Sequence, residues 1–526
     1  MTSETVDTLY GRYGRSYLWL ATVTGVTASF TMVLTGTIAN VAVPNVMGAF
    51  GVGQDLAQFL ATAFIATMTA SQLLNAWFVD TFGQRLAFTI VLAVFAAGGL
   101  LCAFSPTLDF IIVGRIMQGF SAGVVQPLVM VTILQVFPPE RRGTAMGIYG
   151  MGLVLALGLG PVVGGIVIDA LSWRYMFFVP LPLVAVAMIM GTFFMPTTRP
   201  EGSRAPFDWT GYLLLCTALY CVMSAIANGQ REGWSSNTIM SYLLIGGAAA
   251  YAFIHSQLRA DAALLRLSLF GNPRFAAAAV CAFVYGIGNF STTYAVPVFG
   301  QLVQGLTPTA AGSLLLPASL VLVAIFPFTG WLADRAPPQY PLIGGFLLFV
   351  VGTSLLATAD VNTAYASVVI FAMVGRLGMG FIMPSLMTAA IKALPPGELN
   401  VGSGNINFCR QLGGAFGINA LVALMERRTQ FHSDAITATQ TADNAATREL
   451  LRKAGDLVAQ SGLSERIQHA VSLEHLADMI YAQALTSSFQ DGFHMIAAVF
   501  IAAVIPAYVL GRSASRFPRA VPSGHG

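Results

Sequence analysis

The chain has 526 residues, of which 56% are apolar and 9% are charged, with a formal net charge of +3 and a mean hydropathy of +0.72. Soluble domains contain ~45–50% apolar and ~25% charged residues, so this composition excludes a water-soluble globular protein. It also argues against nucleic-acid binding, and against a disulfide scaffold, because the five cysteines all fall inside apolar blocks.

The apolar residues form blocks of about 20, the length that crosses the hydrocarbon core of a bilayer. Proline, glycine and charged residues divide these blocks into fourteen predicted spans. The spans cover residues 17–42, 55–79, 86–105, 108–136, 143–168, 174–195, 209–228, 237–256, 275–300, 309–333, 340–359, 363–391, 399–425 and 491–511. The sequence therefore predicts an all-α polytopic membrane protein.

Basic residues are distributed unevenly between the connections of these spans. The connections on one side, together with the tails 1–16 and 512–526, carry fifteen Arg and Lys residues, whereas the opposite short loops carry only Arg174 and Arg231. Short loops rich in Lys and Arg stay in the cytoplasm. Both tails are therefore predicted to be cytoplasmic, and the long loop 426–490 to lie on the far side of the membrane.

The two halves of the chain repeat each other. AWFVD, which ends at Asp80, matches GWLAD, which ends at Asp334, and Arg115 matches Arg376 within similar glycine-rich strings. The offsets, 334 − 80 = 254 and 376 − 115 = 261 residues, are consistent with one duplication. The predicted plan is a six-helix bundle at 17–195, two inserted spans at 209–256, and a second six-helix bundle at 275–511.

Seven short motifs follow one another in a fixed order. They are TIANVAVP at 37–44, GRIMQGFSAG at 114–123, LGLGPVVGG at 157–165, WRYMFFVPLP at 173–182, FDWTG at 207–211, QLVQGLTPTAAGSLLLP at 301–317 and NFCRQLGGAFG at 407–417. In this order they resemble the major facilitator superfamily, and more narrowly its fourteen-span EmrB/QacA type of drug:proton antiporter. The resemblance implies a multidrug exporter of the bacterial cytoplasmic membrane that works by alternating access and proton antiport.

The far loop is similar to the Gram-negative EmrB branch of that family, through ERRTQFHSD at 426–434 and YAQALTSSFQDGF at 481–493. Members of the branch work with a periplasmic adaptor and an outer-membrane channel, which this resemblance implies as partners. Two apolar faces at helical spacing predict a pair of amphipathic helices in the loop. They consist of Thr447, Leu450, Ala454, Leu457 and Val458, and of Leu473, Leu476, Ala477, Ile480 and Ala484. The alternative is a long connection that packs only on itself.

Two motifs are expected to act in conformational change. By resemblance, Asp80 and the pair Asp334–Arg335 belong to cytoplasmic loops that lock the bundles together, although Asp80 could simply end a span at the water interface. Gly160–Pro161 removes a backbone hydrogen bond and bends the fifth span. In the family this motif marks exporters, whereas the structural alternative is that its glycines only allow neighbouring helices to pack closely.

Three arginines fall inside predicted spans, namely Arg115, Arg376 and Arg410. Charged heads within a bilayer must face protein or water. By resemblance Arg115 takes part in proton transfer, while the alternative is a structural arginine that binds backbone carbonyls. Polar residues at helical spacing predict interior-facing stripes. Their candidate substrate contacts are Gln118, Gln126, Tyr285, Asn289, Asn407, Arg410 and Gln411.

None of the 23 acidic residues falls in the middle of a predicted span. Relatives often carry an acid two positions before the Thr that begins TIANVAVP, where this chain has Thr35. A buried carboxylate can alternate between protonated and ionised forms, and a threonine cannot. We therefore expect anionic or neutral amphiphiles as substrates, and proton coupling through an edge group: Asp55, Asp109 or His494.

Other functions make different predictions. An importer or facilitator of an anionic metabolite would take its substrate up into cells, and a membrane-embedded sensor would not affect drug efflux. An enzyme would need a catalytic constellation, yet the six histidines avoid the span centres and no metal-spaced ligands occur within spans. The sequence thus predicts no catalytic residue, no metal and no cofactor.

Overall fold

The computed structural model describes residues 5–138, 142–197, 207–260, 264–394, 399–441, 443–459 and 465–512. Within these ranges every regular element is a helix. Fourteen helical segments there are long and apolar enough to cross a membrane. The predicted all-α fold and its fourteen spans are confirmed.

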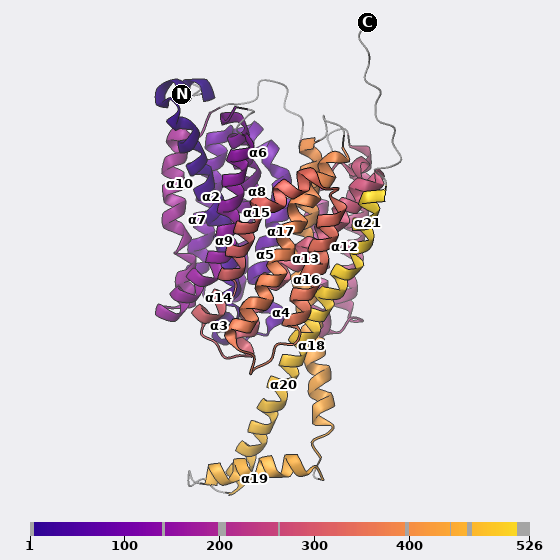
Figure 1. Cartoon of the computed structure of the whole chain (residues 1–526). Coiled ribbons are helices and arrows are strands. Elements are labelled where there is room, and N and C mark those ends of the chain that lie inside the picture. The colour runs from indigo at the N-terminus through magenta and orange to yellow at the C-terminus, as the bar shows by residue number, and fades with distance from the viewer. Residues whose placement is uncertain are drawn as a thin grey trace.

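The helices of the first half form one group, which we call the first bundle. It consists of α2 (Ser16–Val41), α3 (Val43–Phe50), α4 (Gln54–Ala57), α5 (Phe59–Ser71), α6 (Asn75–Phe82), α7 (Gln84–Ala103), α8 (Leu108–Val136), α9 (Arg142–Ala170) and α10 (Pro180–Phe194), preceded by the short helix α1 (Val6–Tyr13). Its helices pack mainly on one another. They stand on one side of the molecule in Figure 1.

The remaining helices form an inserted pair and a second bundle. The pair is α11 (Trp209–Glu232) and α12 (Asn237–Arg259). The second bundle comprises α13 (Pro273–Leu302), α14 (Pro308–Ser313), α15 (Leu316–Arg335), α16 (Gln339–Leu356), α17 (Tyr365–Lys392), α18 (Leu399–Thr437), α20 (Glu465–Ala502) and α21 (Val504–Arg512), with α19 (Ala445–Ala459) outside it. Helices α1 and α21 lie at one end of the molecule, the terminal end, and α19 lies at the other (Figure 1).

The far loop carries its two predicted apolar faces on two helices, α19 and α20, but the second of these helices is continuous with the last span. Helices α18 and α20, of 39 and 38 residues, continue the last two spans beyond the bundle as a stalk, and α19 crosses its tip (Figure 1). At about 1.5 Å per residue each is far longer than a ~30 Å hydrocarbon core requires. The reason lies in the sequence: neither 426–437 nor 465–490 contains a proline or glycine to end the helix.

Charged side chains join the two stalk helices at the base and form pairs within α19 at the tip. At its base Asp491 of α20 accepts hydrogen bonds from Arg428 Nε, at 2.5 Å, and binds His432 Nε2, at 2.7 Å, both on α18. On α19, hydrogen bonds from Arg452 and Lys453 lower the pKa of Glu449 to about 2. We call the end of the membrane region next to the stalk the stalk end.

Candidate functional site

Arg115 is fully buried in α8 and holds three helices together. Its Nε donates to the Leu60 carbonyl of α5 at 2.6 Å, and its Nη1 donates to the Thr35 carbonyl of α2 at 3.2 Å and to Gln118 Oε1 at 2.9 Å. The guanidinium also lies over the Phe64 ring, 4.4 Å from its centroid. These neutral acceptors favour the structural alternative for Arg115 over direct proton transfer.

Thr35 occupies the position where relatives often carry an acid, and the structure places it beside Arg115. Its hydroxyl is engaged by its own helix, because Oγ1 donates to the Thr31 carbonyl at 2.7 Å. Only the Thr35 carbonyl faces the guanidinium. The described hydrogen-bond acceptors of Arg115 are therefore backbone and amide oxygens, and none of them is a carboxylate.

Arg376 forms a second buried site within the second bundle. From α17 it donates through Nη1 to Asn289 Oδ1 and through Nη2 to Thr293 Oγ1 of α13, both at 2.5 Å. Tyr285, one helical turn before Asn289, interacts electrostatically with both Arg376 and Arg410. The predicted contacts Tyr285 and Asn289 thus lie in one polar region with the two arginines.

Arg410 of α18 connects this region to the first bundle. Its Nε and Nη2 donate to Asn407 Oδ1 at 3.1 and 2.5 Å, and Asn407 Nδ2 donates to Gln72 Oε1 of the first bundle at 2.8 Å. Arg410 also interacts with Tyr149 of α9, whose hydroxyl donates to the Gln126 carbonyl of α8 at 3.3 Å. We call Arg376, Arg410, Tyr285 and Tyr149 the arginine–tyrosine cluster.

The predicted substrate contacts fall into two places. Around the arginine–tyrosine cluster lie Gln126, Tyr285, Asn289, Asn407 and Arg410, whereas Gln118 lies with Arg115. Gln411 is 1% exposed, and neither its Oε1 nor its Nε2 has a hydrogen-bond partner among the described residues. Buried amides of this kind need a partner such as water or a ligand.

The acids are arranged quite differently from the arginines. Among the side chains that the structure describes, Asp55 is the one buried Asp or Glu, and it lies at the stalk end rather than beside Arg115 or the cluster. The described interior of the membrane region therefore combines two deeply buried arginines, Arg115 and Arg376, and the half-buried Arg410, with neutral polar partners.

Asp55 takes part in a junction of three parts of the chain. Its backbone N–H donates to Glu426 Oε1 of α18 at 2.9 Å, and its Oδ2 lies 3.5 Å from Arg231 Nη1 at the end of α11. The Glu426 carboxylate therefore binds the Asp55 backbone where the first and second bundles meet, and it also interacts electrostatically with the Asp55 carboxylate. The inserted helix supplies the nearby cation. We call Asp55, Glu426 and Arg231 the stalk-end junction.

Further hydrogen bonds close the stalk end between the two bundles. Gln301 Nε2 donates to the Val41 carbonyl at 2.9 Å, Gln54 Nε2 to the Tyr294 hydroxyl at 3.3 Å, and the Thr309 backbone to Asp169 Oδ2 at 2.9 Å. Farther toward the terminal end, Asn407 donates a hydrogen bond to Gln72 and so also joins the two bundles. The structure thus has its stalk end closed.

The glycine motif of α9 makes close contacts both within the first bundle and across to the second. A methyl group added at Gly160 would overlap Thr37 Oγ1 of α2, and one at Gly165 would overlap the backbone of Pro308 and Thr309. Gly312 faces the Pro161 carbonyl in the same way. Gly160 and Pro161 therefore sit in a seam of backbone contacts between α9, α2 and α14.

The other predicted conformational and coupling residues lie apart from the cluster. Asp80 is exposed at the terminal end of α6, and Arg335 stacks on Trp331 at the end of α15, 4.5 Å from its ring centroid. The Asp334 side chain is not among those that the structure describes. Asp109 and His494 are exposed, on α8 and α20.

The sequence analysis did not identify Glu426 and Arg231 as site residues. It placed Glu426 in the loop 426–490 and considered Arg231 only as a basic residue that bears on membrane orientation. One signal was available for Glu426. It follows the buried Asn419 by seven residues, which places both on one face of a continuous α18. Its pairing with Asp55, 371 positions away, has no local signal.

Comparison with known families identifies the fold. The model of the Major Facilitator Superfamily matches residues 25–418. Solved structures agree: a peptide transporter POT in complex with sulfate superposes with a TM-score of 0.63 at 14% identity, covering 94% of this chain and 95% of that one. A bacterial homolog to the human lysosomal transporter Spinster, in an inward-facing and unoccupied conformation, gives a TM-score of 0.61 at 12% identity, covering 96% and 100%.

Curated relatives are more similar in sequence. The uncharacterized MFS-type transporter YhcA of Bacillus subtilis is 31% identical over 79% of this chain and 78% of its own length. The multidrug transporter protein MdtP of the same organism is 27% identical over 92% and 86%. The lincomycin resistance protein LmrB of Listeria monocytogenes is 27% identical over 76% and 84%.

Proposed function

The chain belongs to the major facilitator superfamily of multi-pass membrane transporters, and we propose that it is a secondary active exporter of anionic or neutral amphiphiles. Relatives named for multidrug transport and lincomycin resistance support export of amphiphiles. The fourteen spans and the ordered motifs support the EmrB/QacA type, with both termini in the cytoplasm of a bacterial inner membrane.

One observation carries the substrate class. Arg115, Arg376 and Arg410 lie within the membrane region, and the hydrogen-bond partners described for them are neutral. Each buried charge that lacks a counter-charge remains costly, so an anionic head group that approaches it gains an interaction that a cationic one lacks. The arginine–tyrosine cluster is the proposed head-group site, with Asn289, Asn407, Gln126 and Gln411 as neighbouring polar contacts; Gln118 belongs to the Arg115 site.

Alternating access follows from the closed stalk end. The bundles meet there through the stalk-end junction and the glycine seam of α9, so opening this end requires both to separate. We infer that Gly160 and Pro161 form the surface on which the two bundles move against each other. We also infer that Asp80, Asp334 and Arg335 stabilise the other state, in which the terminal end is closed. Small residues suit such a surface because they leave backbones in contact.

Proton coupling is assigned to the stalk-end junction. Closing the stalk end brings the carboxylates of Asp55 and Glu426 together, and two neighbouring carboxylates resist being ionised at once. The closed state should therefore bind a proton more tightly than the open state, and by linkage a proton should favour closure. A proton bound from outside would then favour the return to the inward-facing state, and its release to the cytoplasmic side from that state would complete the antiport cycle.

Transport in inverted membrane vesicles tests the proposal. With the vesicle interior acidified, we expect radiolabelled decanesulfonate to accumulate inside, because that interior corresponds to the outside of the cell. Vesicles from cells without the protein provide the control. The same cluster would also suit an importer of an anionic metabolite, and uptake into intact cells with no accumulation in inverted vesicles would establish that alternative and contradict export.

An adaptor partner is proposed for the stalk. Apolar side chains on the part of α20 beyond the bundle are exposed, among them Leu473 at 45% and Met479 at 46%. We propose that this exposed part of α20 contacts the periplasmic adaptor, which would connect the transporter to an outer-membrane channel. Exposed apolar residues on a helix outside the membrane fit docking of this kind.

Deletion of residues 440–475 should abolish drug resistance in cells while the protein still inserts in the membrane. The pair Leu473→Asp and Met479→Asp should act in the same direction because each replaces an exposed apolar side chain in the docking segment of α20 by a charged one. Glu474→Lys, on the same helix, provides the matched control. Resistance that survives both the deletion and the double substitution would contradict docking at the stalk.

A further inference from the structure

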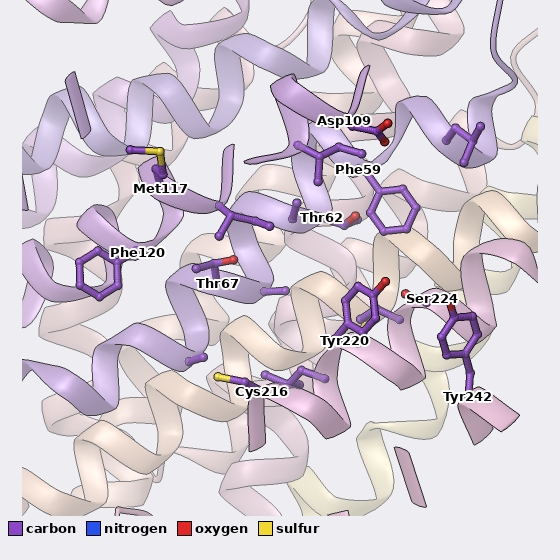
Figure 2. A pocket seen from close by; sticks show the side chains of 18 of the residues that line it. Phe59, Thr62, Thr67, Asp109, Met117, Phe120, Cys216, Tyr220, Ser224 and Tyr242 are labelled. Atoms are coloured by element: carbon purple, nitrogen blue, oxygen red, sulfur yellow. The ribbon is translucent and has the colours of Figure 1, made fainter. Parts of the chain in front are cut away.

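A cavity of about 730 Å³ lies between the first bundle and the inserted helix α11 (Figure 2). Three helices each present one face to it, since their lining residues recur at three- and four-residue intervals. These faces are Phe59, Ala63, Ala66 and Ala70 of α5, Asp109, Ile112, Ile116 and Phe120 of α8, and Tyr212, Cys216, Leu219 and Met223 of α11. None of the predicted substrate contacts lines this cavity, which we call the seam cavity.

The seam cavity lies between two helices of the first bundle, α5 and α8, and the inserted helix α11, which packs on the second bundle. Helix α11 is packed on the second bundle through a cluster that joins Leu215 to Phe408 of α18. At the stalk end α11 also reaches the first bundle, where Arg231 pairs with Asp55. The cavity is therefore bordered by the first bundle on one side and by a helix carried by the second bundle on the other.

The membrane gives access to the seam cavity. Ile116 and Tyr220, which line it, are 43% and 63% exposed although both belong to predicted spans, so packing does not seal the cavity along this part of the membrane region. A volume of about 730 Å³ falls within the ~300–1,000 Å³ of small-molecule sites. The cavity can thus receive a drug-sized compound directly from the bilayer.

The lining has a charged end and an apolar end. Near the stalk end lies Asp109, at the start of α8, and in Figure 2 its carboxylate is next to Phe59, whereas Met117 and Phe120 lie at the opposite end. Asp109 is the one charged residue of the lining, and its carboxylate has no hydrogen-bond or ion-pair partner among the described residues. Tyr220 and Tyr242 add aromatic faces on the α11–α12 side (Figure 2).

We propose that the seam cavity binds a lipophilic monocation from the outer part of the bilayer, at a site separate from the arginine–tyrosine cluster. The cationic centre lies at Asp109, where charge attraction and the neighbouring Phe59 ring favour it, and Tyr220 and Tyr242 line the α11–α12 side of the cavity. The apolar body extends along α5 and α8 toward Phe120. The charge of this site is opposite to that of the cluster, so the two sites select opposite head groups.

Binding of tetraphenylphosphonium to the full-length protein in lipid nanodiscs tests the proposal, with tetraphenylborate as a probe of nearly the same shape and opposite charge. We expect saturable binding of the cation that weakens at least tenfold in Asp109→Asn. Glu232→Gln, which removes another carboxylate at the same membrane surface, should bind as the unmodified protein does. Ala66→Trp should abolish binding by filling the cavity while leaving the size-exclusion profile unchanged.

A second readout locates the ligand. Cys216 lines the seam cavity, whereas Cys409 lies on α18 outside it. Tetraphenylphosphonium should slow the reaction of Cys216 with a membrane-permeant maleimide, followed by peptide mass spectrometry, and leave Cys409 unaffected. Equal protection by tetraphenylborate, or cation binding that is unchanged in Asp109→Asn and Ala66→Trp, would overturn the proposal. Because both readouts measure binding, their result is independent of whether decanesulfonate is transported.

Discussion

Glu426→Gln is expected to uncouple transport from the pH gradient. The substitution keeps the hydrogen bond that Glu426 Oε1 accepts from the Asp55 backbone, but it removes the group that would gain and lose the proton. Accumulation of decanesulfonate in acidified inverted vesicles should fall by more than tenfold, to the level without a gradient. Exchange of labelled for unlabelled substrate, which needs no net proton movement, should continue.

Two further variants sharpen this prediction. Asp55→Asn should have the same effect as Glu426→Gln, since either removes the repulsion between carboxylates that links closure to protonation. Asp434→Asn, an exposed carboxylate two turns farther along α18, should leave gradient-driven accumulation intact. Full accumulation in the Asp55→Asn, Glu426→Gln double variant would move the coupling site away from the stalk-end junction, and Asp109 and His494 would become the groups to test.

Arg410→Gln should reduce transport of anionic amphiphiles by about 10- to 100-fold, because a hydrogen bond to a charged group contributes roughly 1.5–3 kcal/mol and 1.4 kcal/mol corresponds to tenfold. Arg410 is the arginine of the cluster that also reaches the first bundle, through Asn407 and Gln72. The initial rate of decanesulfonate uptake in inverted vesicles measures the effect.

Loss of charge must be separated from loss of structure. Decyl glucoside, a neutral amphiphile with the same chain, should be transported by Arg410→Gln at close to the unmodified rate. Arg410→Lys should retain part of the anion transport, and Arg427→Gln, an exposed arginine on the same helix, should retain all of it. If both substrates are lost together, Arg410 only positions helices; if neither is lost, the cluster is not the head-group site.

The sequence predicts the membrane-spanning helices well for a simple physical reason. A helix that crosses a bilayer must be apolar along about 20 residues, so each span can be identified from its local sequence. The fourteen spans follow from composition alone, and the family follows from seven motifs in order. The polar stripes also predict that Tyr285 and Asn289 face the same interior as Arg410, because helical spacing fixes the shared face.

Features that depend on distant contacts could not be predicted in the same way. The partners of Arg115 are carbonyls of Leu60 and Thr35, and nothing in the motif distinguishes this structural role from one in proton transfer. The stalk-end junction joins positions 55 and 426, and the seam cavity depends on where the inserted α11 packs. These arrangements arise from tertiary packing, which the local pattern does not contain.

The stalk is a third case, in which the local sequence indicates a continuous helix but is easily interpreted as a helix end. Charged residues after position 425 indicate the end of a membrane span, and this is easily taken for the end of a helix. The chain leaves the membrane without a proline or glycine, however, so α18 continues to Thr437. As a result Glu426 belongs to a rigid helix facing Asp55, rather than to a solvated loop.

The most direct test compares two substrates that have the same decyl chain and head groups of opposite charge. The initial rates of decanesulfonate and decyltrimethylammonium uptake are measured with the unmodified protein in inverted vesicles at matched concentrations and membrane potential. Because the arginine–tyrosine cluster holds buried arginines with neutral partners, the protein should transport the sulfonate at least tenfold faster. Faster transport of the trimethylammonium compound would contradict this electrostatic account of the substrate site.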